Sequence, residues 1–167
     1  LVRPENELYT PSKLNYEMHD LLDISWSKDI KDAVSQEKIN YYIHDNWETL
    51  GDIFVHAHDA GEEEFIEDTF NNIDKLIDLD FGRVYDTNIA DIHIYKADSN
   101  AKLLNDPRTD GYAQKMHKNG KNWIDVWWKN LVPDYRSDFP TEYSQITGIE
   151  SWIITHEIGH ALGLAHP

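Results

Sequence analysis

The sequence of 167 residues contains no cysteine. A disulfide framework, a zinc site built on thiolates and latency through a cysteine ligand within this chain are therefore all excluded. A bound metal ion would need ligands from His, Asp, Glu or Tyr side chains. This restriction makes the nine histidines the first residues to consider.

Basic residues are scarce, since 15 Lys and Arg stand against 31 Asp and Glu and give a net charge of −16 at pH 7. Such a charge repels a phosphate backbone and an anionic membrane surface. No apolar run approaches the roughly 20 residues that span a bilayer, and the opening stretch LVRPENELYT lacks the features of a signal peptide. We expect neither nucleic acid nor a membrane as a partner.

Internal repeats, including glycine-rich calcium-binding nonapeptides, are also absent. Hydrophobic residues nevertheless make up 40% of the chain and aromatic residues 12%, which suffices for a buried core. The length suits one domain. We therefore expect residues 1–167 to form a single globular unit.

Hydrophobic periodicity predicts an α/β fold of the α+β kind, with a mixed sheet and two long helices. The expected helices cover residues 62–79 and 147 to about 163, after a short helix at 19–26. The expected strands cover residues 38–45, 80–86, 90–98 and 122–128, and residues 105–112 are expected to form a loop. Thr147 and Glu150 have the spacing of a capping box, which would start the last helix.

The chain ends on the stretch THEIGHALGLAHP, residues 155–167. On a helix, His156 and His160 lie four residues apart on one face and can direct their imidazoles at one point, with Glu157 beside it. Gly163 can end the helix in a left-handed conformation, which lets the chain bring His166 back as a third ligand. Pro167 cannot extend a helix.

Three neutral imidazoles suit Zn²⁺, and a catalytic zinc site has three protein ligands and an open position. We expect His156, His160 and His166 to bind Zn²⁺ and Glu157 to act as general base in peptide-bond hydrolysis without a covalent intermediate. Five fixed residues match by chance on the order of 10⁻⁷ per starting position at average composition. A bare His-Glu-x-x-His would be weaker evidence, because that shorter pattern also occurs on ordinary helices.

The stretch resembles the extended zinc motif of the metzincin metallopeptidases, and Pro167 after the third histidine resembles the serralysin branch. A weaker resemblance to the family covers roughly residues 20–167. The resemblance implies a metzincin-like catalytic domain with a twisted mixed sheet, an antiparallel edge strand and a second helix that carries the zinc motif. It also implies a secreted zinc endopeptidase acting on extended protein or peptide substrates. A substrate would add as a strand to the edge strand, for which the candidate residues are Trp123, Ile124, Asp125, Val126 and Trp127.

The chain departs from the family in two respects. Met18 and Met116 both precede the motif, so neither belongs to the methionine-containing turn of metzincins, and the serralysin calcium-binding repeats are missing. We expect the chain to be the N-terminal part of a catalytic domain whose C-terminal subdomain is absent. The alternative is a zinc-binding but inactive module, or a fragment that needs the missing segment for activity.

Two further histidines, His56 and His58, leave two interpretations open. With Asp52 and Asp59 they could form a second metal site. They could instead be isolated surface histidines, which is favoured because no fixed ligand spacing supports a metal site.

Overall fold

A computed structural model describes residues 38–77, 79–98, 101, 109–130, 146 and 148–165. Within these ranges the elements are β1 Lys38–Ile43, β2 Glu48–Leu50, β3 Ile53–His56, α2 Ala60–Asp74, β4 Asp80–Arg83, β5 Ile92–Ala97, β6 Gly111–Lys118, β7 Lys121–Lys129 and α3 Gly148–Ala161. The expected short helix at 19–26 lies outside the described residues. Neither described helix is long and apolar enough to cross a membrane.

The strands form one mixed sheet. β1 pairs in parallel with both β4 and β5, and β5 pairs in parallel with β7. β6 pairs antiparallel with β7, while the β2–β3 hairpin joins the end of β5 through the pairs Val55 with Ala97 and His56 with Lys96. The mixed sheet and the two helices predicted from the sequence are confirmed, and this arrangement is compatible with the α+β class.

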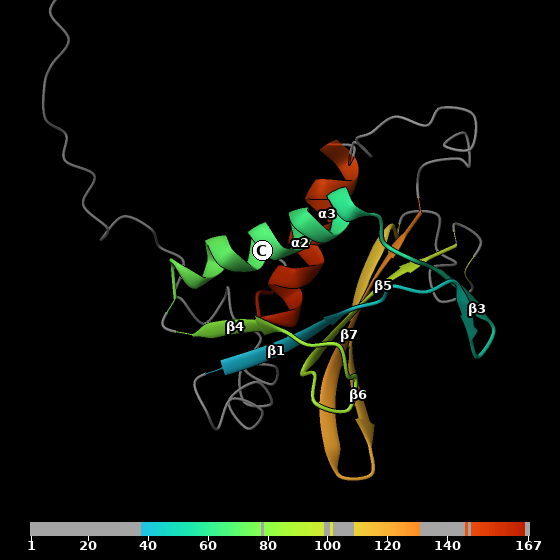
Figure 1. Ribbon diagram of the computed structural model, residues 1–167, viewed down its shortest axis with the longest axis horizontal. Coiled ribbons are helices and arrows are strands. Elements are labelled where there is room, and N and C mark those ends of the chain that lie inside the picture. Colours follow the sequence, from blue (N-terminus) through green and yellow to red (C-terminus); the bar gives the residue numbers. More distant parts are fainter. Residues whose placement is uncertain are drawn as a thin grey trace, which may run out of the picture.

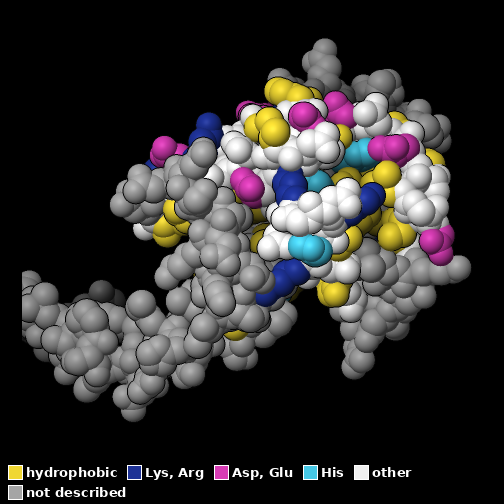
Figure 2. Space-filling model, turned by 90° about the horizontal axis from the view of Figure 1, so that it is seen from below, with side chains coloured by type: hydrophobic (Ala, Val, Ile, Leu, Met, Phe, Trp, Pro, Cys, Tyr) yellow, Lys and Arg dark blue, Asp and Glu magenta, His cyan; other side chains and the backbone are white. Residues whose placement is uncertain are grey.

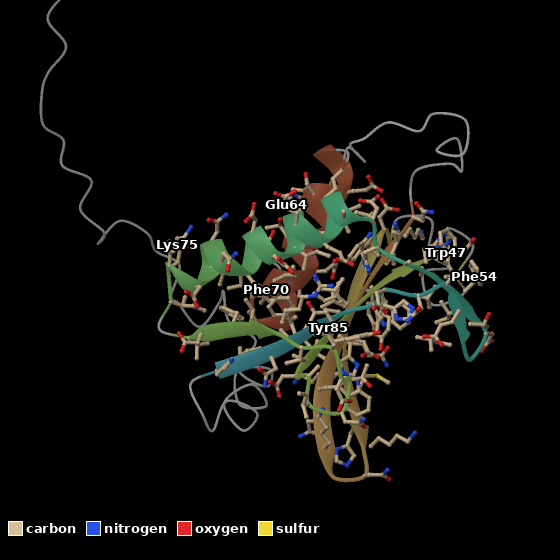
Figure 3. All side chains as sticks on the ribbon, in the orientation of Figure 1. Trp47, Phe54, Glu64, Phe70, Lys75 and Tyr85 are labelled. Atoms are coloured by element: carbon tan, nitrogen blue, oxygen red, sulfur yellow. The ribbon has the colours of Figure 1, made fainter. Side chains whose placement is uncertain are left out.

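Both helices lie on one side of this sheet (Figure 1). Ile43, Ile94 and Val126 of the sheet form a single apolar cluster with Phe70 of α2 and Ile158 of α3. Burying each such side chain stabilises the fold by about 1.5–3 kcal/mol. This cluster fixes α2 and α3 against the same sheet, and Figure 3 shows Phe70 on the side of α2 that faces the strands.

The first long helix starts earlier and ends earlier than predicted. Asp59 caps it, because the Asp59 side chain accepts a hydrogen bond from the Glu62 N–H while the Glu62 side chain accepts one from the Asp59 N–H. Ile66 and Phe70 are buried, as the periodicity predicted. The predicted end at residue 79 is wrong, since the helix ends at Asp74 and the Leu76 side chain beyond it is 81% exposed.

Of the loop predicted at 105–112, residues 105–108 lie outside the described residues and residues 109–110 belong to no strand, but Gly111 and Tyr112 begin strand β6, so the prediction is wrong there. The sequence analysis did not predict this strand, nor β2 and β3. Asn119 and Gly120 connect β6 to β7 with φ values of 54° and 79°. An Asn-Gly pair with both φ values positive is the usual turn of a two-residue hairpin, so the signal was present in the sequence.

The other face of the sheet carries a second, smaller apolar cluster, formed by Val55, Tyr95, Ala97, Ala101 and Trp127. Figure 2 shows the molecule from this side, with histidine and basic side chains among hydrophobic ones. At the β2–β3 hairpin, Trp47 and Phe54 lie beside each other with ring centroids 6.1 Å apart (Figure 3). Because this second cluster is the smaller of the two, the main core lies on the face that the helices cover.

Candidate metal centre

Helix α3 carries the motif and packs on the sheet through one apolar side. Ile153, Ile154 and Ile158 are buried, whereas His156 and His160 are partly exposed. Since the buried isoleucines fix the rotation of the helix about its axis, the two histidines are held on its outer side. The helix runs from Gly148 to Ala161, in agreement with the prediction, but the proposed cap Thr147 lies outside the described residues.

Gly163 ends the helix as predicted, with a left-handed φ of 95°. The Leu164 N–H donates to the Gly159 carbonyl at 3.0 Å, and the Gly163 N–H donates to the His160 carbonyl at 2.9 Å. These two bonds are the Schellman motif, which reverses the chain after a helix. Leu164 Cδ1 lies 3.3 Å from where a Cβ on Gly159 would be, so the small residue leaves space for the turn.

The turn also orients one of the two helical histidines. His160 Nδ1 lies 2.6 Å from the Leu164 carbonyl oxygen, which can only accept, so Nδ1 carries the proton. In the neutral ring the lone pair then belongs to Nε2, the atom that a metal would bind. His160 Nε2 lies 3.0 Å from His156 Nε2, and the two rings are nearly perpendicular at 88°.

This geometry fits the donor set that zinc prefers. Two nitrogens at tetrahedral zinc–nitrogen distances are about 3.3 Å apart, close to the 3.0 Å between His156 and His160. The third predicted ligand, His166, lies outside the described residues. Among the residues that are described, no group of three or more potential ligands meets at one point.

Glu157 lies next to the histidine pair, in an apolar setting. The residue is 6% exposed, and a Cβ on Gly111 would lie 2.6 Å from both Cγ and Oε1 of Glu157 and 2.7 Å from Cγ2 of Ile153. Burial raises the pKa of Glu157 to about 7. A carboxylate with a pKa near neutrality can accept a proton and return it at physiological pH, as a general base must.

Gly111 is a site residue that the sequence analysis missed. It begins β6, and its lack of a side chain lets the strand approach Glu157 closely. The Tyr-x-Gln-x-Met alternation of residues 112–116 before Asn119-Gly120 indicated a strand, but its contact with α3 was not predictable from local pattern.

The strand that was predicted to lie at the edge of the sheet, β7, lies inside it, so the predicted edge position is wrong. β7 pairs with β5 on one side and β6 on the other, so its backbone groups are already used. Ile124 and Val126 are buried in the main core. Trp123 Nε1 donates to Asp125 Oδ1 at 2.8 Å, and Trp127 stacks on Tyr95. Among the described strands, the outer antiparallel strand on this side is β6.

His56 and His58 do not converge on one point with Asp52 and Asp59. His58 is buried and its Nδ1 donates to the His44 carbonyl at 2.6 Å, and burial lowers the pKa of His58 to about 3. His56 Nε2 lies 3.6 Å from Asp98, and the Asp59 side chain caps α2. The surface-histidine interpretation also fails, because His56 and His58 are both buried.

Comparison with models of known protein families finds no match, and comparison with curated proteins finds none. The case for a function therefore depends on the site itself.

Proposed function

We propose that the chain is a zinc-dependent endopeptidase of metzincin type. The observation that carries this proposal is the convergence of His156 and His160, with Nε2 atoms 3.0 Å apart and His160 oriented by the Leu164 carbonyl. His166 would supply the third ligand. Support also comes from Glu157, which the motif places directly after the first ligand and which has a raised pKa.

When bound, zinc would lower the pKa of water at the site to about 7 and polarise the scissile carbonyl. The proton transfers would be carried out by Glu157. Glu157 takes the proton of the attacking water and passes it to the leaving amine, so a protonated carboxyl is formed and consumed in each turnover. Its apolar surroundings favour that neutral form.

The substrate would bind as an extended peptide beside β6, the strand whose first residue contacts Glu157. Strand addition satisfies the backbone groups of an outer strand and holds a peptide straight across the neighbouring site. In this proposal the antiparallel strand to which a substrate adds is therefore β6 and not β7.

The test is hydrolysis of an unfolded protein by the zinc-loaded chain, compared with Glu157→Gln at equal zinc loading. We expect kcat/KM to fall by about 10² to 10⁴ in the variant, because the general base is lost while the ligands are kept. A chelator should abolish activity in the wild type.

The alternative, a zinc-binding but inactive module, predicts a different result. Both proteins would then bind zinc and neither would cleave the substrate. If the wild type does not bind zinc at all, both functions are wrong.

A further inference from the structure

Trp152 extends the line of the two helical histidines by one turn. Trp152, His156 and His160 follow one another at intervals of four residues and therefore form a stripe along one side of α3. The Trp152 side chain is 63% exposed, although the adjacent Ile153 and Ile154 are buried in the core. A large aromatic residue thus lies at the surface directly beside the candidate metal centre.

The Trp152 ring stacks on the ring of His156, with centroids 4.8 Å apart and planes 23° apart. A stacked contact restrains the plane of an imidazole. The lone pairs of an imidazole lie in that plane, so a partner on the ring face does not compete with a metal for them. The stack can therefore orient His156 without occupying a ligand atom.

The two histidines would be oriented by different means from opposite ends of the stripe. The Leu164 carbonyl holds His160 through Nδ1, and the Trp152 indole covers a face of His156. Between these contacts the His156 and His160 rings cross at 88° with their Nε2 atoms 3.0 Å apart. Rotation of the His156 ring away from the indole would break that convergence.

We propose that Trp152 is a positioning residue for the metal ligand His156. This inference rests on the proposed function, because it takes His156 to bind zinc. Groups that orient metal-binding histidines from outside the ligand set change metal affinity by about 10- to 100-fold when they are removed.

The test is the dissociation constant of Zn²⁺, measured by competition with a chromogenic chelator, for the wild type, Trp152→Ala and Trp152→Phe. Trp47→Ala is the matched control, because Trp47 is 62% exposed and lies 4.6 Å from the ring of His56, far along the chain from the motif. We expect about tenfold weaker binding in Trp152→Ala, recovery to within about twofold in Trp152→Phe, and no change in Trp47→Ala.

A second measurement tests whether Trp152 lies beside the bound metal. Co²⁺ quenches the fluorescence of nearby indoles, so its binding should quench the wild type and Trp47→Phe more than Trp152→Phe. Equal zinc affinity in the wild type and Trp152→Ala would overturn the inference and leave the proposed function standing. An affinity loss that Trp152→Phe fails to restore, with the thermal midpoint of Trp152→Phe unchanged, would also overturn it. Absence of zinc binding in the wild type would overturn both.

Discussion

Two buried glutamates, Glu62 at the start of α2 and Glu157 on α3, are nearly equal in exposure at 1% and 6% but differ in surroundings. Both oxygens of Glu62 lie within 2.8 Å of Lys96 Nζ, and Glu62 Oε2 also accepts from the Asp59 N–H. For Glu157, no hydrogen bond to the carboxylate is found within the described part of the chain, and its neighbours Gly111 and Ile153 are apolar.

The comparison shows how one residue type serves two purposes. Burial raises the pKa of Glu62 as well, but Lys96 and the Asp59 N–H oppose that rise, and the ion pair connects α2 to β5. A buried carboxylate among apolar groups has an elevated pKa and can exchange a proton near neutral pH. The surroundings of each glutamate, and not its exposure, therefore separate a structural carboxylate from a candidate catalytic one.

Replacing Lys96 with Met tests the structural side of the comparison and should have the largest effect. Met keeps the volume but leaves Glu62 buried without its cation, so we expect a loss of about 3–5 kcal/mol in the free energy of unfolding, measured in urea. The double variant Lys96→Met with Glu62→Gln should recover most of this loss, because a neutral amide can still accept from the Asp59 N–H. A loss below about 1 kcal/mol in the single variant would show that the pair is not structural.

His58, at the same end of α2, should contribute to the pH dependence of stability with a sign opposite to that of Glu157, whose raised pKa lowers stability as the pH rises from about 4.5 to 7. Burial lowers the pKa of His58 from 6.5 to about 3, so below pH 6.5 the unfolded chain binds a proton that the folded chain does not. The contribution of His58 to the free energy of unfolding is fully present above pH 6.5. It decreases as the pH falls towards 3, with a slope approaching about 1.4 kcal/mol per pH unit.

Unfolding in urea at pH 7 and pH 5, for the wild type and for His58→Asn, isolates the His58 contribution as the difference between the two slopes. His58→Asn keeps a donor for the His44 carbonyl and removes the His58 titration, so the stability of the variant should rise less from pH 5 to pH 7 than that of the wild type, by up to about 1.4 kcal/mol per pH unit. Equal slopes in the variant and the wild type would assign the pH dependence to other groups.

The sequence predicted the position of Glu157 but not the surroundings of either glutamate. The position of Glu157 follows from the motif, and Gly163 ends α3 as its sequence position indicated. The alternating residues Ile124, Val126 and Trp128 of β7 all lie in the main core. What surrounds each glutamate depends on partners far away in the chain, since Lys96 lies 34 residues after Glu62. The edge position was assigned to β7 from the family resemblance, and β6, with its polar side chains, was not recognised as a strand.

The smallest predicted effect comes from Gly111, where the surroundings of Glu157 can be changed without altering the carboxylate. A Cβ at Gly111 would lie 2.6 Å from Cγ and Oε1 of Glu157, so Gly111→Ala must displace that side chain. Because the histidines are untouched, we expect kcat/KM to fall about five- to tenfold while zinc affinity stays the same, which corresponds to about 1 to 1.4 kcal/mol.

Gly148→Ala is the matched control for this change, since a Cβ there has no other atom within 4 Å and α3 would keep its contacts. Activity should be unchanged in that variant. If Gly111→Ala retained full activity, the contact between β6 and Glu157 would have no role in orienting the base. A parallel loss of zinc affinity would instead mean that the added methyl group displaces α3 as a whole. The pair of alanine variants thus asks whether the apolar setting of Glu157 is a requirement of catalysis or only a consequence of helix packing.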